Sequence, residues 1–207
     1  MHGVQRLLLR VWRHVPRPLR RWIVRAVAPS FTVGAACVVE RDDGAILLVR
    51  LVYREGWGLP GGLIKRNEDV ADCARREVLE EIGLPVELAG QPAVVVDSRP
   101  QRVDVVFRAR PAGGADPAAV RPRSPEIRET RWFDPGQLPT LQHETVSALG
   151  ALASSVLGAA DVEVGAAPAG LQVAAEAARA QARRRTDRRD RDRDRDTGGE
   201  GRPAAVS

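Results

Sequence analysis

Apolar residues in the central part of the chain follow two patterns, one typical of buried strands and one typical of an amphipathic helix. Two continuous apolar runs, residues 33–40 and 45–51, flank the sequence RDDG at 41–44, which favours a tight turn. We therefore expect two paired strands at the start of the domain. Similar runs predict further strands at residues 93–96, 103–110 and 127–133.

Helical spacing marks two further segments. Apolar residues at positions 70, 71, 74, 78 and 82 predict a helix that Asn67 caps and that Gly83 and Pro85 end. Residues 142–157 predict a last helix. Together the strands and helices define one α/β domain over residues 30–157 of the 207-residue chain.

The N-terminal region, residues 1–29, holds two short amphipathic patterns with Arg on the opposite side, separated by Pro16 and Pro18. Their apolar positions are Val4, Leu7, Leu8 and Val11, then Leu19, Trp22, Ile23, Ala26 and Val27. Basic helices of this kind either lie on an anionic membrane surface or pack against their own domain or a dimer mate. Internal packing is the more common use of a short apolar face, and we expect it for this extension.

The C-terminal region, residues 158–207, is rich in Ala and then in alternating Arg and Asp (RRRTDRRDRDRDRD). A helix over residues 171–185 agrees with the propensity of Ala, but a face made of Ala is a poor anchor. Low-complexity sequence without large apolar residues is typical of disorder. We therefore expect a disordered tail.

The net charge of +5 is unevenly distributed along the chain. Residues 1–30 hold seven Arg and no acidic residue, whereas residues 31–182 hold 16 basic and 21 acidic residues. The domain is therefore acidic and only its ends are basic. This distribution argues against specific binding of nucleic acid and agrees with a site for a divalent cation.

The cysteines and the N-terminal arginines indicate in which cellular compartment the protein is expected. Cys37 and Cys73 are the only cysteines, too few for a disulfide framework or a zinc site. The seven Arg of residues 1–30 interrupt each apolar run before it reaches the length of a signal peptide or a membrane span. These features favour a cytoplasmic protein.

The helix expected after residue 69 gathers Glu77, Glu80 and Glu81 beside its apolar stripe, within an arc of roughly 100°. Like charges three or four residues apart repel by roughly a few tenths of a kcal/mol, so a purely structural helix gains nothing from this arrangement. Carboxylate oxygens suit Mg²⁺ and Mn²⁺, which retain waters and bridge to phosphate groups. The cluster therefore predicts a metal site, with Arg76 placed to balance or orient a neighbouring carboxylate.

The same segment resembles a complete Nudix box. The pattern is Gly62, five residues, Glu68, seven residues, Arg76-Glu77-Val78, one residue, Glu80-Glu81, one residue and Gly83-Leu84. The preceding sequence WGLPG at 57–61 is also typical of that family. The resemblance implies a Nudix fold, in which a mixed β-sheet lies between α-helices.

The resemblance also implies a role for each residue of the motif. Arg76 and Glu68 would fix the orientation of the helix and its carboxylates, while Gly62 and Gly83 would have structural roles. The implied ligands of Mg²⁺ or Mn²⁺ are three carboxylates and one backbone carbonyl, those of Glu77, Glu80, Glu81 and Gly61.

Members of the family use a further acid outside the motif, as a metal ligand or as the base that activates water. The segment SPEIRETRWF at 124–133 resembles the one that supplies it, and Glu126 is our first candidate, with Glu129 second. Activation of water needs a carboxylate that is free to accept a proton, which leaves Glu77 and Glu126 as candidates for the base. The sequence does not decide between them.

Two aromatic residues before the motif, Tyr53 and Trp57, are candidates for substrate binding. Each could stack on a nucleobase, and each could equally pack the loop that leads into the motif. Cys73 lies one turn before Glu77, and we expect it to be a small buried thiol rather than a metal ligand.

Together these features predict a Mg²⁺- or Mn²⁺-dependent hydrolase that cleaves the phosphoanhydride of a nucleoside diphosphate linked to another group. ADP-ribose, another nucleotide sugar and a nucleoside triphosphate are the leading substrates, and we expect a monomer or a homodimer. The alternative is a non-catalytic Nudix-fold module that senses a nucleotide without hydrolysing it. Such a module has no reason to retain acids that repel one another.

Overall fold

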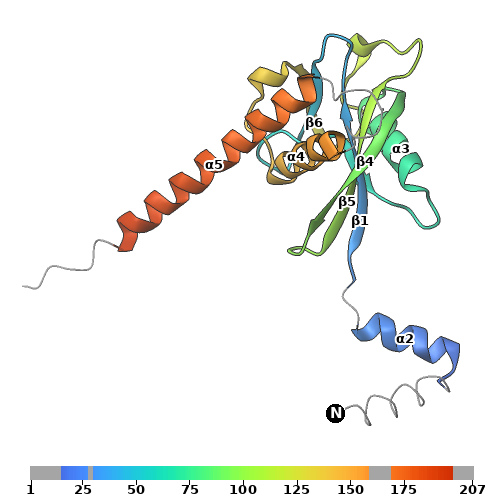
Figure 1. The fold of residues 1–207 in the computed structure, drawn as a ribbon. Coiled ribbons are helices and arrows are strands. Elements are labelled where there is room, and N and C mark those ends of the chain that lie inside the picture. The colour runs from blue at the N-terminus through green and yellow to red at the C-terminus, as the bar shows by residue number, and fades with distance from the viewer. Residues whose placement is uncertain (1–14, 28–29, 159–168, 198–207) are drawn as a thin grey trace, which may run out of the picture.

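The architecture is that of a mixed β-sheet between helices, as predicted. The computed structural model describes residues 15–27, 30–158 and 169–197 (Figure 1). Four strands form the main sheet in the order β3-β1-β5-β4, where β1 is Thr32–Val39, β3 Gly61–Leu63, β4 Val86–Asp97 and β5 Arg102–Pro111. Within it β1 and β5 are parallel, and the other two pairs are antiparallel. Strands β2 (Ile46–Leu51) and β6 (Ile127–Phe133) form a second, antiparallel sheet.

The predicted pairing of the first two strands is wrong, although the turn between them forms. Gly44 N–H donates to the carbonyl of Arg41 over 2.8 Å, and a single bridge joins Glu40 to Ile46. Beyond that bridge both edges of β1 are taken, one by β3 and the other by β5, so β2 pairs with β6 instead. The apolar runs are continuous because both strands are buried on both faces, not because they form an exposed hairpin.

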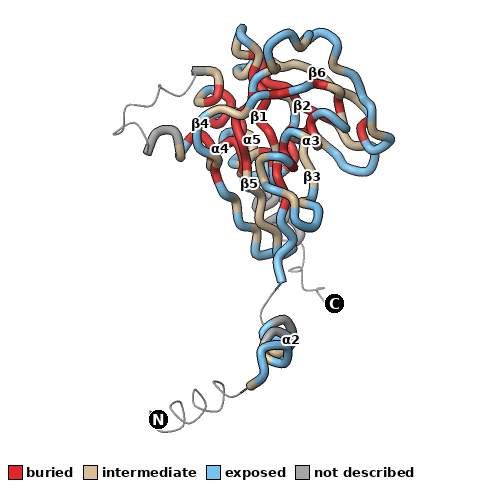
Figure 2. Tube along the Cα trace, turned by 90° about the vertical axis from the view of Figure 1, so that its right-hand side faces the viewer, coloured by how far each residue is buried: buried red, intermediate tan, exposed pale blue. Residues whose placement is uncertain are grey.

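Helices cover both faces of the sheets (Figures 1 and 2). Helix α3 (Val70–Ile82) packs on one face, against inward residues such as Cys37 and Phe107. Helices α4 (His143–Gly158) and α5 (Ala169–Thr197) pack on the other face, against Val38 and Val106. Two single-turn 3₁₀ helices, η1 (Pro117–Ala119) and η2 (Pro135–Gln137), lie in the connections on either side of β6.

The start of α3 differs by two residues from the prediction. The cap is Asp69, whose carboxylate accepts from the N–H of Ala71 over 2.8 Å. Asn67 instead takes a left-handed conformation (φ 62°) in the turn before the helix, which Asn tolerates better than most residues. The end of α3 is as predicted, because Gly83 adopts φ 74° and donates its N–H to the carbonyl of Leu79.

The second N-terminal pattern forms helix α2 (Arg17–Val27), whereas the first, at residues 4–11, lies outside the described residues. In Figure 1, α2 lies apart from the sheet, beyond the start of β1. Its side chains Leu19, Trp22 and Val27 are 47%, 67% and 79% exposed. In the structure, this face therefore does not pack on its own domain as we expected. Within the described ranges, no helix has the length and the hydropathy that crossing a membrane requires.

The expectation of disorder after residue 158 is wrong for Ala169–Thr197, which form α5. The first half of α5 buries Leu171, Ala174, Ala175 and Ala178 against α4 and the sheet. Small Ala side chains allow two helices to approach closely, so a face that looked like a poor anchor packs well. Gln181 adds polar contacts, since its amide donates to the carbonyl of Pro139 over 2.8 Å and its oxygen accepts from the N–H of Leu141 over 3.2 Å.

This packing predicts that α5 contributes to the stability of the domain. Replacing the buried Leu171 (Leu171→Ala) should lower the free energy of unfolding by about 2–4 kcal/mol, because it removes apolar contacts and leaves a cavity. The matched change on the exposed side of the same helix, Val173→Ala, should cost less than about 0.5 kcal/mol. Urea denaturation of both variants measures the difference. Equal effects would show that α5 does not belong to the cooperative unit.

Candidate active site

The Nudix-like segment runs from a strand through a loop into a helix, and the fold brings its two ends together. Strand β3 lies beside β1, and α3 packs on the same part of the sheet. The buried residues of α3 are Cys73, Ala74, Val78 and Ile82. Their packing turns the neighbouring glutamates of α3 towards the glycines of β3, which gathers most of the polar residues predicted for the site.

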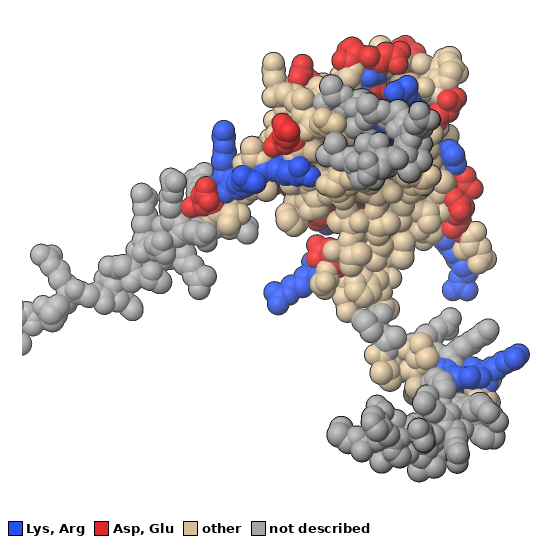
Figure 3. Space-filling model, in the orientation of Figure 1, with Lys and Arg blue, Asp and Glu red and all other residues tan. Residues whose placement is uncertain are grey.

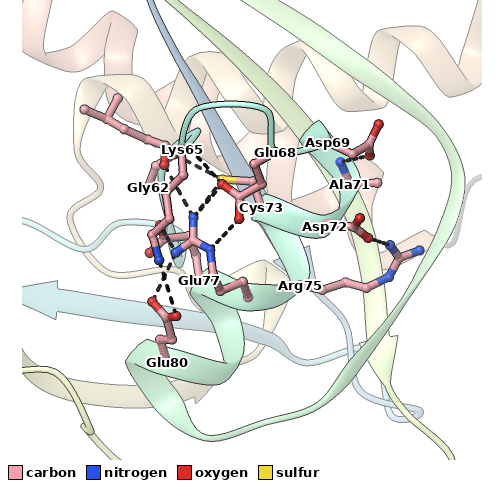
Figure 4. A network of polar contacts seen from close by, with 12 residues as sticks. Gly62, Lys65, Glu68, Asp69, Ala71, Asp72, Cys73, Arg75, Glu77 and Glu80 are labelled. Carbon is pink, nitrogen blue, oxygen red and sulfur yellow. Dashed lines mark hydrogen bonds and ion pairs between the residues drawn. The ribbon is translucent and has the colours of Figure 1, made fainter.

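Hydrogen bonds from Arg76 join Glu68, Glu77 and Glu80, which Figure 4 labels in the polar network. The guanidinium donates to the carboxylate of Glu68 over 2.5 and 2.9 Å, to Glu77 Oε1 over 2.7 Å and to Glu80 Oε2 over 3.0 Å. Lys65 reinforces the outer part of this network, with its Nζ 3.6 Å from Glu80 Oε1. Arg76 and, at Glu80, Lys65 therefore offset the repulsion between the carboxylates of Glu77 and Glu80 on adjacent turns.

Glu68 joins the loop to the helix. Besides pairing with Arg76, its carboxylate accepts from the backbone N–H of Lys65 over 2.8 Å. The hydrogen bonds from Arg76, followed by the one from Lys65, lower the pKa of Glu68 to about 2. The same pairing raises the pKa of Arg76, with Glu68 as the main cause. Glu68 therefore stays ionised, and it holds Arg76 in one orientation, as the motif implies.

Glu81 differs from Glu77 and Glu80 because its hydrogen-bond partner is a backbone N–H group rather than Arg76. Its Oε2 accepts from the N–H of Gly61 over 3.1 Å, and the structure shows no ion pair to it among the described residues. Burial raises the pKa of Glu81 to about 8, against the lowering effect of the Gly61 bond and with added repulsion from Glu77, Glu126 and Glu80. A half-buried carboxylate surrounded by negative charge favours the approach of a cation.

The two glycines before the helix leave room for different neighbours. A Cβ on Gly62 would lie 2.5 Å from the carboxylate carbon of Glu77. A Cβ on Gly61 would lie 2.3 Å from the backbone carbonyl oxygen of Ala35 in β1. Gly62 therefore makes space for a glutamate of the cluster, whereas Gly61 allows β3 to lie close to β1.

The acid outside the motif is brought to the same region from a distant part of the chain. Glu126 directly precedes β6, and its Oε2 accepts from the hydroxyl of Tyr53 over 3.0 Å. Its charge contributes to the raised pKa of Glu81, which places it near the cluster. Glu129, the second candidate, lies in β6 and pairs with Arg131 over 2.8 Å. Glu126 remains our first candidate, because it is the one of these two acids whose charge contributes to the raised pKa of Glu81.

The two aromatic candidates have different environments. Trp57 is 8% exposed, and its ring meets Phe133 edge-on with the centroids 4.8 Å apart, so it packs the core rather than presenting a face to a base. Tyr53 is 62% exposed and faces Glu126. The contact between Tyr53 and Glu126 and the position of Lys65 beside Glu80 were not anticipated from the sequence. Neither has a local signal, because each depends on how distant segments pack.

The described residues contain no group of three or more His, Cys, Asp or Glu side chains arranged to hold a metal ion. Glu77 and Glu80 are turned onto Arg76, and Glu81 onto Gly61. The chemistry of the donors nevertheless fits a hard divalent cation, because every candidate atom is a carboxylate or carbonyl oxygen. Cys73 is buried and free, as expected, and its thiol has a pKa raised to about 11, mainly by burial.

The NUDIX domain family model matches residues 30–150 of the sequence. A MutT-like protein of Streptomyces ambofaciens is 34% identical over 110 residues, which are 53% of this chain and 68% of that protein. A protein of Bacillus subtilis (strain 168) that carries the provisional name 8-oxo-dGTP diphosphatase is 31% identical over 109 residues, 53% of this chain and 70% of that protein.

The fold is also similar to a solved structure. An ADP-ribose pyrophosphatase from Streptococcus suis 89-1591 matches with a TM-score of 0.51 and 28% sequence identity, over 65% of this chain and 96% of that chain. The family match spans more than half of the chain and includes the strand, loop and helix that build the site. The chain therefore belongs to the Nudix family of hydrolases.

Proposed function

We propose that this Nudix hydrolase is a Mg²⁺- or Mn²⁺-dependent pyrophosphohydrolase that cleaves the phosphoanhydride of a nucleoside diphosphate linked to another group. The observation that carries the proposal is the position of Glu77, Glu80 and Glu81 on one side of α3, where Glu81 meets the backbone of Gly61 and Glu77 that of Gly62. Hydrolysis of a phosphoanhydride concentrates negative charge on phosphate oxygens, and oxygen ligands that hold divalent cations are the usual means of neutralising it.

The residues that would hold the metal are Glu77, Glu80, Glu81 and the carbonyl of Gly61. When bound, such cations supply charge neutralisation and lower the pKa of a water molecule. Arg76 and Glu68 keep the carboxylates of α3 oriented, because Glu68 holds the guanidinium against the helix from the loop side. This arrangement restricts the carboxylates before any ligand arrives, which reduces the entropy that binding costs.

Glu126 is our candidate for the base that accepts a proton from water, with Glu77 as the alternative. Glu77 Oε1 already accepts a hydrogen bond from Arg76, so this oxygen is occupied. Glu126 is exposed, and Tyr53 donates one hydrogen bond to it, so its second oxygen can face water. These contacts favour Glu126 as the base, and we propose that Tyr53 supports this carboxylate rather than a nucleobase.

The substrate class has support from the relatives. One is named for an oxidised deoxynucleoside triphosphate, and the structural neighbour is named for ADP-ribose. Both substrates contain a phosphoanhydride next to a nucleoside, and the proposal is limited to that shared chemistry.

The proposal predicts turnover of at least one compound in a panel that includes ADP-ribose, nucleotide sugars, 8-oxo-dGTP and ordinary nucleoside triphosphates, assayed with Mg²⁺. Replacing Glu81 with the isosteric amide (Glu81→Gln) should lower kcat/KM by at least about a hundredfold, because it removes a negative ligand while an oxygen remains for the N–H of Gly61. Chromatography of the products measures the rate.

The matched control is Glu176→Gln, the same substitution at an exposed position of α5, which should leave the rate unchanged. Full activity in Glu81→Gln would exclude the metal assignment. Binding of nucleotides by the wild type without turnover of any of them would favour the sensing module instead.

The two glycines predict opposite effects on stability and activity. In Gly62→Ala the new methyl group meets the end of the flexible Glu77 side chain, so the carboxylate moves, kcat falls by about tenfold or more, and the free energy of unfolding changes little. In Gly61→Ala the methyl group meets the backbone of β1, which should lower the free energy of unfolding by roughly 1–3 kcal/mol. Paired kinetics and urea denaturation test this. An activity loss in Gly62→Ala that merely tracks a loss of stability would contradict it.

A further inference from the structure

Helix α2 presents an apolar face that no part of the described chain covers. Placed at about 100° per residue, its apolar positions 19, 22, 23, 26 and 27 fall within an arc of roughly 140°. The exposed members of this arc include Leu19, Trp22 and Val27. Val24 is 50% exposed as well, but it lies outside the arc, on the side of Arg17 and Arg20. The helix is therefore amphipathic, and Leu19, Trp22 and Val27 on its apolar side are exposed.

The charge of the segment indicates what can cover this face. Residues 1–30 carry seven Arg and no Asp or Glu, and Figure 3 draws only basic (blue) and uncharged (tan) side chains among those shown on α2. A second α2 would be repelled, because both helices carry charge of one sign. An anionic lipid surface attracts each Arg and also accepts an apolar face that contains Trp.

We propose that α2 binds the surface of anionic membranes, with Leu19, Trp22 and Val27 inserted at the level of the lipid headgroups and Arg17 and Arg20 next to the phosphates. This interaction does not involve the glutamates of α3. It would hold the hydrolase domain at the membrane through the short connection between α2 and β1.

One competing surface lies on the domain itself. The register of the main sheet aligns Val33, Val103 and Val96 in one row across β1, β5 and β4. Val33 and Val96 in this row are 40% and 60% exposed, and Val94 on β4 is 58% exposed. An apolar row of this kind could accept α2 of the same chain or of a second copy, so the experiment has to distinguish a lipid from a protein surface.

Flotation of the full-length protein with phosphatidylcholine vesicles, with and without phosphatidylglycerol, tests the proposal. The wild type should float with the anionic vesicles and not with the neutral ones. Added salt should weaken this binding, because it screens the arginines. Reversal of Arg20 (Arg20→Glu) should lower the partition coefficient by about fivefold or more, given the contribution of a single basic residue near an anionic surface.

A matched pair of variants separates the apolar face from the charge. Leu19→Asp and Val24→Asp change the net charge equally, but only Leu19 lies on the apolar side. Leu19→Asp should lower the partition coefficient by about tenfold more than Val24→Asp. Nucleotide hydrolysis and the circular dichroism spectrum should be unchanged in both, which shows that the domain remains folded.

Three results would overturn the proposal. Equal binding to neutral and anionic vesicles, or no binding to either, would remove the role of the charge. Equal effects of Leu19→Asp and Val24→Asp would remove the role of the apolar face. A wild-type dimer in light scattering that Leu19→Asp or Val96→Glu converts into a monomer, without any vesicle binding, would assign the face to a second copy of the chain.

Discussion

The guanidinium of Arg76 donates to three carboxylates, those of Glu68, Glu77 and Glu80, and the arrangement of the site depends on these contacts. Without them the negative charges on α3 would repel one another and the loop before the helix would lose its link to it. Hydrogen bonds between ionised groups are roughly twice as strong as those between neutral groups, and here they link the loop that follows β3 to α3. Glu81 takes no part in these contacts, and its burial, with added repulsion from the neighbouring glutamates, raises its pKa.

Local sequence signals predicted the helix that carries most of the motif. The apolar stripe of α3 and the left-handed Gly83 at its end agree with patterns that extend over a few residues, whereas the short strand β3 was not predicted. Asp69 replaced Asn67 as the cap because both residue types can cap a helix, and the sequence pattern does not resolve which of two neighbours takes the left-handed turn.

Features that depend on distant contacts were not predictable in this way. The turn between β1 and β2 predicted a hairpin, yet β1 pairs with β3 at one edge and with β5 at the other. No local sequence pattern reveals this pairing. Helix α5 has few large apolar residues, and its stability comes from the close approach of alanines to α4. The contact of Tyr53 with Glu126 joins residues 73 positions apart, so its existence follows from the fold alone.

The site therefore combines carboxylates of α3 with Glu126, which directly precedes β6 of the second sheet. The central claim is that the carboxylates of α3 hold a divalent cation. Binding of Mn²⁺ in the absence of nucleotide, followed by the electron paramagnetic resonance signal of the free ion, tests this claim most directly. The wild type should bind Mn²⁺, and Glu81→Gln should bind it at least about tenfold more weakly. Equal Mn²⁺ affinity in the two proteins would contradict the account.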